Sequence, residues 1–200
     1  MDIKRFIEGP VMTNMYVVSD KDKNGFIVDA AFPSQQAIDY IKNQGIKIKF
    51  IIQTHTHFDH VLGLSYLKNL YQVDVYASED SREIANDKEY NLAFGYDIDV
   101  PIDKYLRDGQ VFSDFKIMAI KTPGHTLDSM SYKINDIIFS GDTLFNMSIG
   151  RSDLKGGDYG QIIDSIKNKL GLFDKDSKIL SGHGEATKLG FELANNPFLV

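Results

Sequence analysis

The feature that most constrains the fold is an apolar run, residues 46–52, which leads directly into residues 54–60, THTHFDH. Five of the seven residues in the run are apolar, which predicts a buried β-strand. Three histidines and a carboxylate then fall within six positions, although the whole chain has only five histidines. A strand with this segment at its end predicts a fold that gathers metal-binding side chains at one edge of a sheet.

Other side chains that can bind metals also follow predicted strands. A strand predicted at 115–120 precedes His125, and a short one at 178–180 precedes His183. A hairpin with arms at 130–134 and 137–139 precedes Asp142. Loops at the carboxyl ends of strands commonly carry the ligand sites of α/β folds. We therefore expect seven side chains to converge: His55, His57, Asp59, His60, His125, Asp142 and His183.

The spacing of these residues separates them into two groups. His55 and His57 point the same way in an extended segment, so they can chelate one ion, which His125 could complete. Asp59 and His60 lie in the turn that opens the next predicted helix and therefore suit a second ion, which His183 could complete. Asp142 has two oxygens and could bridge both ions.

The ligand types indicate a catalytic pair of divalent ions. Imidazole and carboxylate without sulfur favour zinc, with iron or manganese also open. Three protein ligands per ion leave a position for water, which is the mark of a catalytic site. A lone histidine is usually a surface or core residue, but here all five belong to the constellation.

The other segments alternate between predicted strands and helices. Strands are expected at 3–11, 12–19, 26–28 and 73–77, with a hairpin turn at Asn24-Gly25. Helices are expected at 34–44, 61–71, 78–88, 159–170 and 188–195. Residues 91–110 lack clear periodicity and are predicted to be a surface loop or lid.

Composition narrows the class of protein. The 200 residues fit one domain spanning 1–200, and the absence of cysteine favours a reducing cytoplasm. A net charge of −6 argues against nucleic acid as a partner. No apolar run approaches the ~18 residues of a membrane span, so no membrane association is expected.

Four motifs of the chain resemble those of the metallo-β-lactamase superfamily: residues 54–60, 123–126, 140–145 and 182–184. Residues 149–153 and 196–199 look more specifically like the glyoxalase II (hydroxyacylglutathione hydrolase) branch in a short single-domain form. The resemblance implies an αββα sandwich of two mixed sheets flanked by helices, with a binuclear metal site at one edge. It also implies a small-molecule thioester of a 2-hydroxy acid as the substrate, attacked by a metal-bridging hydroxide. The number of subunits stays open.

The resemblance also suggests roles for three further side chains. Asp59 would act as a catalytic residue that helps orient the hydroxide. Asp29 resembles a position that supports the metal ligands, although an Asp after a strand also often forms a turn. Arg151 would either meet an anionic substrate or pair with Asp153.

Two departures from the glyoxalase II pattern bear on this reading. Asp128 stands where that branch usually has Gly, and we expect it to preserve the turn because Asp tolerates left-handed backbone. The chain also stops at Val200, before the C-terminal helical region that supplies much of the glutathione contact in the longer enzymes. The substrate could therefore be a thioester of a thiol other than glutathione, or a smaller or different ester.

Two other functions compete with thioester hydrolysis. A persulfide dioxygenase, from a related branch, would use a single iron held by His55, His125 and Asp142. A non-catalytic metal or ligand-binding module is the third reading, and seven candidate ligands exceed the four of a structural zinc site.

Overall fold

The first of two large sheets is built from the N-terminal half of the chain. A computed structural model describes residues 1–200 and orders its strands β1-β2-β3-β4-β5-β6. Strands β1 to β3 pair antiparallel, and β3 to β6 pair parallel. The six strands are β1 (Asp2–Glu8), β2 (Thr13–Ser19), β3 (Asn24–Val28), β4 (Lys47–Ile52), β5 (Asp74–Ser78) and β6 (Lys104–Leu106).

The second sheet is built from the C-terminal half, in the order β14-β13-β10-β9-β8-β7. Only β10 and β13 pair parallel; the other neighbours are antiparallel. Its strands are β7 (Val111–Phe112), β8 (Ile117–Lys121), β9 (Met130–Ile134), β10 (Ile137–Gly141), β13 (Lys178–Ser181) and β14 (Thr187–Lys188). A small separate ribbon consists of β11 (Leu144–Phe145) and β12 (Ser148–Ile149).

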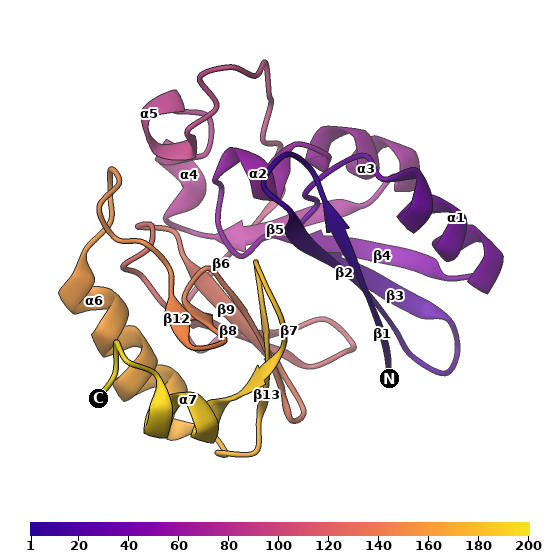
Figure 1. Cartoon of the computed structure of the whole chain (residues 1–200). Helices are drawn as coiled ribbons and strands as arrows, with labels where there is room; N and C mark the ends of the chain where they lie inside the picture. The colour runs from indigo at the N-terminus through magenta and orange to yellow at the C-terminus, as the bar shows by residue number, and fades with distance from the viewer.

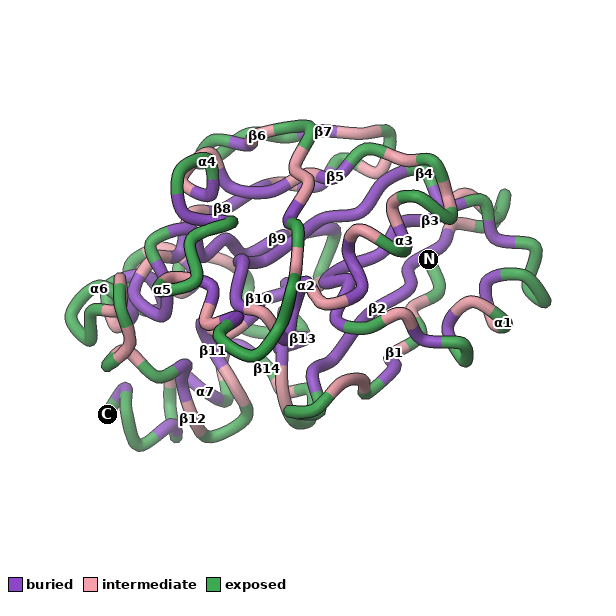
Figure 2. The backbone as a smooth tube through the Cα atoms, turned by 90° about the horizontal axis from the view of Figure 1, so that it is seen from above, coloured by how far each residue is buried: buried purple, intermediate pink, exposed green.

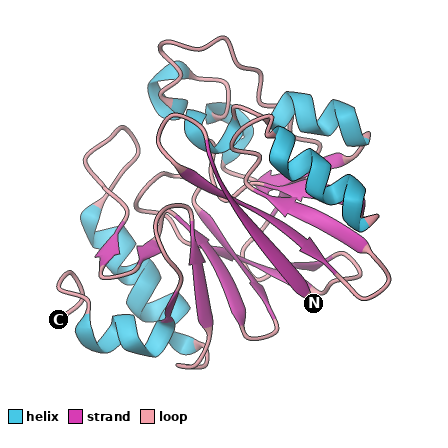
Figure 3. Cartoon of the chain, turned by 45° about the vertical axis from the view of Figure 1, so that its right-hand side comes forward, coloured by secondary structure: helices cyan, strands magenta, loops and turns pink.

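Helices cover the outer faces of the two sheets (Figure 1 and Figure 3). The first sheet is covered by α1 (Gln35–Gln44) and α3 (Leu64–Tyr71). The second is covered by α6 (Tyr159–Asp164), which continues as a π-turn and a 3-10 turn to Leu172, and by α7 (Leu189–Asn195). Short helices α2 (Phe58–Val61), α4 (Ser81–Ile84) and α5 (Lys88–Asn91) lie in the connections. The predicted αββα architecture is confirmed.

Alternation along the strands produces three apolar layers. In β3, Phe26 and Val28 face the second sheet, whereas Ile27 between them faces the helices. All three are buried, so this strand is apolar throughout its core rather than alternating with polar residues. Figure 2 shows buried backbone running through the strands of both sheets. The sheets are therefore fixed by packing on both faces, which holds the loops at their carboxyl ends in place.

Several local predictions are confirmed and others are wrong. Helix α1 is capped as its sequence predicts: the Ser34 hydroxyl accepts from the amide of Ala37, and Gly45 is left-handed at its end. The prediction of a hairpin turn at Asn24-Gly25 is wrong. The Asp20 carboxylate accepts from the amides of Asp22 and Asn24, which moves the turn to residues 20–23 and lets β3 begin at Asn24.

The two helical predictions nearest the site and the predicted lid also need correction. The helix expected at 78–88 is two short helices, because the Asp87 side chain accepts from the amide of Glu89 and begins a new turn at α5. The helix expected at 61–71 is divided into α2 and α3. Residues 91–110 are not a loop throughout, since β6 within them pairs with β5. No helix combines the length and the apolar character needed to cross a bilayer.

Candidate metal centre

The structure brings all seven predicted side chains together. Asp59 and His60 lie in α2, and the other five come from the loops that follow β4, β8, β10 and β13. In one half of the cluster, Nε2 of His125 lies 2.9 Å from Nδ1 of His57. In the other half, Nε2 of His183 lies 3.2 Å from Oδ2 of Asp59, and Nε2 of His60 lies 3.4 Å from the same oxygen. Segments that are distant in sequence therefore meet at one edge of the sandwich.

Asp142 lies between the two halves. Its Oδ2 atom is 3.5 Å from Nε2 of His125 and 3.5 Å from Nε2 of His183, and its Oδ1 atom is 3.4 Å from Nε2 of His60. The potential ligand atoms form three groups, and within each group they lie within 4.8 Å of one another. The groups are His55, His57 and His125; His55, His60 and Asp142; and Asp59, His60 and His183. The first and last match the two sets that the spacing predicts.

Hydrogen bonds outside the cluster select the ring nitrogen that faces into it. The Nδ1 atom of His125 lies 2.7 Å from the carbonyl oxygen of Arg151, so Nδ1 carries the proton and donates. The Thr54 hydroxyl donates to Asp29 and therefore accepts from Nδ1 of His55, 3.2 Å away. Nδ1 of His60 faces Oδ2 of Asp29 at 2.9 Å. In His55 and His125 Nε2 is left with a lone pair directed at the cluster, and in His60 it is likewise Nε2 that faces the cluster.

Asp29 organises two of these rings at once. Oδ1 accepts from the backbone amide of Thr54 at 2.7 Å, and Oδ2 accepts from the Thr54 hydroxyl at 2.8 Å as well as facing His60. The residue has a left-handed backbone, with φ of 56°, just after β3. Both readings from the sequence therefore hold geometrically, because Asp29 turns the chain and also contacts the histidine motif.

Several buried atoms in the cluster have no hydrogen-bond partner in the chain. They are His55 Nε2, His57 Nε2, His60 Nε2 and Asp142 Oδ1. Buried polar atoms are normally paired, and leaving one unpaired costs about 1–3 kcal/mol. A divalent cation would satisfy Nε2 of His55, Nε2 of His60 and Oδ1 of Asp142. His57 faces the cluster through Nδ1, so its Nε2 atom is not one of the atoms that this cation would satisfy.

The protonation of the two halves differs in the absence of a cation. Burial, with the neighbouring His60 and His57 rings, holds the pKa of His55 well below its usual value. Burial and the His125 ring lower the pKa of His57 to about 3. The half that contains His55 and His57 is therefore neutral and ready to bind a metal at neutral pH.

Carboxylates dominate the other half. Burial lowers the pKa of His60, but Asp59, Asp142 and Asp29 outweigh it and raise the pKa well above its usual value. Burial also lowers the pKa of His183, but hydrogen bonds to Asp142 and Asp59 outweigh it and raise the pKa to about 9. For Asp59, burial raises the pKa, yet His60 and His183 bring it down to about 2. Protons here occupy positions that a cation would take.

Two glycines from the motifs at residues 149–153 and 182–184, to which the sequence assigns no role, shape the cluster. A Cβ atom on Gly182 would lie 2.1 Å from Oδ1 of Asp142, and one on Gly150 would lie 1.7 Å from the carbonyl oxygen of Asp142. Thr13 was also missed; its hydroxyl donates to Oδ2 of Asp59 at 2.7 Å. Gly182 adjoins His183 in the sequence, but neither the close approach of Gly150 nor that of Thr13 leaves a signal in the sequence alone.

The structure has one of the two interactions predicted for Arg151 and corrects the prediction for Asp128. The Arg151 side chain is exposed and pairs with Asp153 through two contacts of 2.8 Å, so of the two predicted alternatives the structure has the ion pair, and only the Arg151 carbonyl contacts the cluster. Asp128 does not have the left-handed backbone that we expected. It is instead fully buried, with its carboxylate accepting from the hydroxyls of Thr56 and Ser81.

Comparison with known proteins agrees with this geometry. The family model of the metallo-beta-lactamase superfamily matches residues 9–183. The probable metallo-hydrolase YqgX of Bacillus subtilis is 32% identical over 100% of this chain and 98% of its own length. Hydroxyacylglutathione hydrolase GloC of Haemophilus influenzae is 30% identical over 93% of this chain and 92% of its own. The crystal structure of BLEG-1 B3 metallo-beta-lactamase superposes with a TM-score of 0.94 at 33% identity, covering 100% of both chains.

Proposed function

The chain belongs to the metallo-β-lactamase superfamily, and from this we propose that it is a binuclear metallohydrolase that cleaves thioesters of 2-hydroxy acids. The observation that carries the proposal is the position of Asp142, whose Oδ2 atom is equally distant, at 3.5 Å, from a histidine of each half of the cluster. One carboxylate placed in this way is suited to two cations rather than one. Two cations at such a site would acidify water and polarise a carbonyl oxygen.

In this proposal each side chain has a defined task. His55, His57 and His125 would hold one ion, and Asp59, His60 and His183 the other, with Asp142 shared. Zinc fits this donor set, and iron or manganese would fit it too.

Asp59 would have a catalytic task as well. Its pKa of about 2 keeps the carboxylate ionised at neutral pH, so it can only accept hydrogen bonds. Thr13 already donates to Oδ2, which holds the carboxylate in one orientation. The carboxylate would then accept a hydrogen bond from water and direct its lone pair toward the substrate carbonyl.

The substrate would approach past His183. The side chain of His183 is 28% exposed, whereas that of His60 is fully buried. The Phe145 ring lies beside His183, with ring centroids 6.1 Å apart, and offers an apolar surface to an acyl group or thiol. The choice of a 2-hydroxyacyl thioester rests on the likeness to the hydroxyacylglutathione hydrolase across almost its whole length.

A panel of substrates tests the proposal. Zinc-loaded and metal-free protein would be assayed with 2-hydroxyacyl thioesters of glutathione and of other thiols, an oxygen ester, a β-lactam and a persulfide with oxygen uptake. We expect metal-dependent turnover of a thioester at least tenfold above the other classes. Preferential β-lactam hydrolysis, oxygen consumption with the persulfide, or full metal loading without any turnover would each contradict the proposal.

A matched pair of variants connects turnover to the site. Asp142→Asn should abolish thioester hydrolysis, because the shared ligand loses its charge. Asp153→Asn removes an exposed carboxylate of the same type and should leave the rate unchanged. Equal activity of the two variants would contradict the assignment of the site.

A further inference from the structure

Asp128 is a buried carboxylate that holds a part of the histidine motif. It is 1% exposed, and its Oδ2 atom accepts from the Thr56 hydroxyl at 2.7 Å and from the Ser81 hydroxyl at 3.0 Å. Its side-chain hydrogen bonds come from hydroxyl groups alone, and its Oδ1 atom is buried without a partner. A buried charge supported only by hydroxyl groups is costly, so its presence calls for an explanation beyond the turn.

Thr56 is the residue that this carboxylate holds most closely. It lies between His55 and His57, and it is itself 2% exposed. A hydroxyl bonded to a buried carboxylate fixes the Thr56 side chain, and with it the peptide groups on either side. The position of the backbone that carries both histidines is therefore tied to Asp128.

His57 depends on this tie more than the other two histidines in its half. Nδ1 of His55 is oriented by Thr54, and Nδ1 of His125 by the carbonyl of Arg151. His57 has no such partner: its Nδ1 atom faces His125, and its Nε2 atom is buried and unpaired. Because no hydrogen bond to Nε2 orients the His57 ring, the backbone at Thr56 determines where Nδ1 of His57 points.

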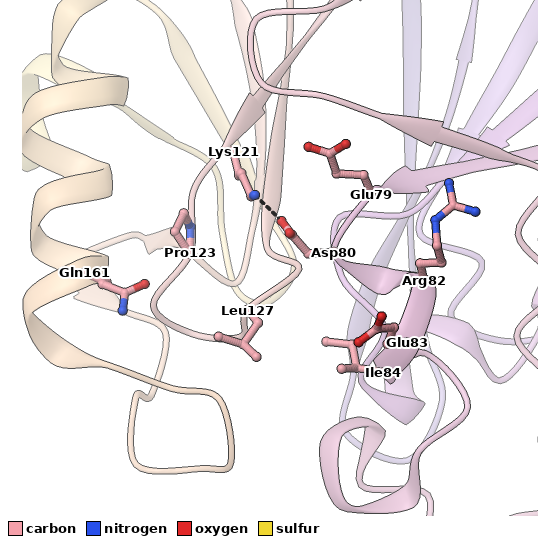
Figure 4. A pocket seen from close by; sticks show the side chains of 9 residues that line it. All are labelled: Glu79, Asp80, Arg82, Glu83, Ile84, Lys121, Pro123, Leu127 and Gln161. Atoms are coloured by element: carbon pink, nitrogen blue, oxygen red, sulfur yellow. Dashed lines mark ion pairs between the residues drawn. The ribbon is translucent and has the colours of Figure 1, made fainter.

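The same carboxylate connects the motif to the surface. A cavity of about 530 Å³ is lined by residues of α4 and by Pro123 and Leu127. Figure 4 shows Glu83 and Ile84 of α4 on one side of it and Pro123 and Leu127 on the other. Asp128 follows Leu127, and Ser81 is the first residue of α4. The hydrogen bond between Asp128 and Ser81 therefore joins the two walls of this cavity and fixes the loop against α4.

We propose that Asp128 is a positioning residue that, through the Thr56 hydroxyl, sets the orientation of His57 and so the affinity of the half formed by His55, His57 and His125. The inference rests on the proposed metal pair. A glycine at this position cannot accept a hydrogen bond from Thr56, so this chain holds the motif with a contact that the glycine-containing pattern lacks. The half formed by Asp59, His60 and His183 is supported by Asp29 and Thr13 instead.

Zinc binding in single-ion backgrounds tests the proposal. His183→Ala should leave only the half with His57 competent, and His125→Ala only the half with His60. In the His183→Ala background, Asp128→Gly and Thr56→Val should each weaken zinc binding by about 10- to 100-fold, as loss of a supporting contact usually does. In the His125→Ala background the same changes should alter affinity less than about threefold. Competition with a chromogenic chelator measures these affinities.

Three further variants separate positioning from general stability. Thr56→Ser keeps the hydroxyl and should retain most of the affinity. The double variant Asp128→Gly/Thr56→Val should bind no more weakly than the weaker single variant, because both remove one contact. Ser81→Ala removes the other hydroxyl on the same oxygen but no ligand neighbour, so it should lower Tm while leaving zinc affinity unchanged.

Each contrary result has a distinct meaning. Equal weakening in both backgrounds, additive effects of the two changes, or a lower Tm with unchanged zinc affinity would show that Asp128 only stabilises the fold, and would overturn this inference alone. If the unmodified protein binds no zinc, the proposed metal pair fails first, and the role of Asp128 fails with it.

Discussion

Adding one methyl group at Gly182 should disable the cluster without changing any ligand. The Cβ atom of an alanine there would lie 2.1 Å from Oδ1 of Asp142 and 2.6 Å from Cε1 of His60. Because Cβ contacts below 3.0 Å essentially never occur, the Asp142 carboxylate has to move by at least about 0.9 Å. The backbone cannot yield easily, since the Gly182 amide donates to Gly141 and its carbonyl accepts from Asn14.

A displacement of that size is large for a metal ligand. A misplacement of about 1 Å can reduce catalysis by about 100-fold, and overpacking a buried site typically costs about 1–3 kcal/mol of stability. We therefore expect Gly182→Ala to lower kcat/KM by about 100-fold and to reduce the zinc content below that of the unmodified protein. Thioester hydrolysis, elemental analysis and thermal unfolding on the same preparation measure the three effects.

Gly95→Ala is the matched control. The added methyl at Gly95 meets no atom within 4 Å, so activity, metal content and Tm should stay unchanged. If Gly182→Ala retains the full metal content and the kcat/KM of the unmodified protein, then the position of Asp142 does not govern the site, and the reasoning is wrong.

Three further predictions follow from the same contacts. Asp142→Ala should lower occupancy at both metal positions, and elemental analysis that shows an unchanged metal-to-protein ratio would exclude the shared role. Asp29→Asn should weaken zinc binding by about 10- to 100-fold, because it weakens the hydrogen bond that supports His60. Chelator competition measures this affinity, and an unchanged value would contradict the role of Asp29. In metal-free protein the pKa of His183, raised from 6.5 to about 9, contributes stability that is fully present below pH 6.5 and is lost as pH rises through about 9. Tm of the metal-free protein should therefore fall over that range while zinc affinity rises, and calorimetry in two buffers should detect released protons; a flat Tm and a pH-independent affinity would contradict the assigned proton.

The convergence of the seven side chains could be predicted from sequence because each of them follows the end of a strand. The apolar run before His55 and the hairpin before Asp142 are strong local signals, and parallel or aligned strand ends bring their loops to one edge. The capped helix α1 was also predictable, because Ser34 and Gly45 form hydrogen bonds with residues only three or four positions away in the sequence.

What the sequence missed depends on contacts between distant segments. Asn24-Gly25 resembles a hairpin turn, but the Asp20 side chain forms the turn earlier. Residues 104–106 form β6 because they pair with β5 at the edge of the first sheet. The local sequence of these three residues does not indicate that pairing. Asp128 was expected to serve a left-handed turn, yet its partner Ser81 lies 47 positions away. Such partners become visible only when the fold is known.

Anomalous diffraction from a zinc-loaded crystal would show whether two cations share Asp142. We expect two peaks about 3.5–4 Å apart, one beside His55, His57 and His125 and one beside Asp59, His60 and His183, with Asp142 contacting both. A single peak held by His55, His125 and Asp142, or two peaks with Asp142 contacting only one of them, would contradict it.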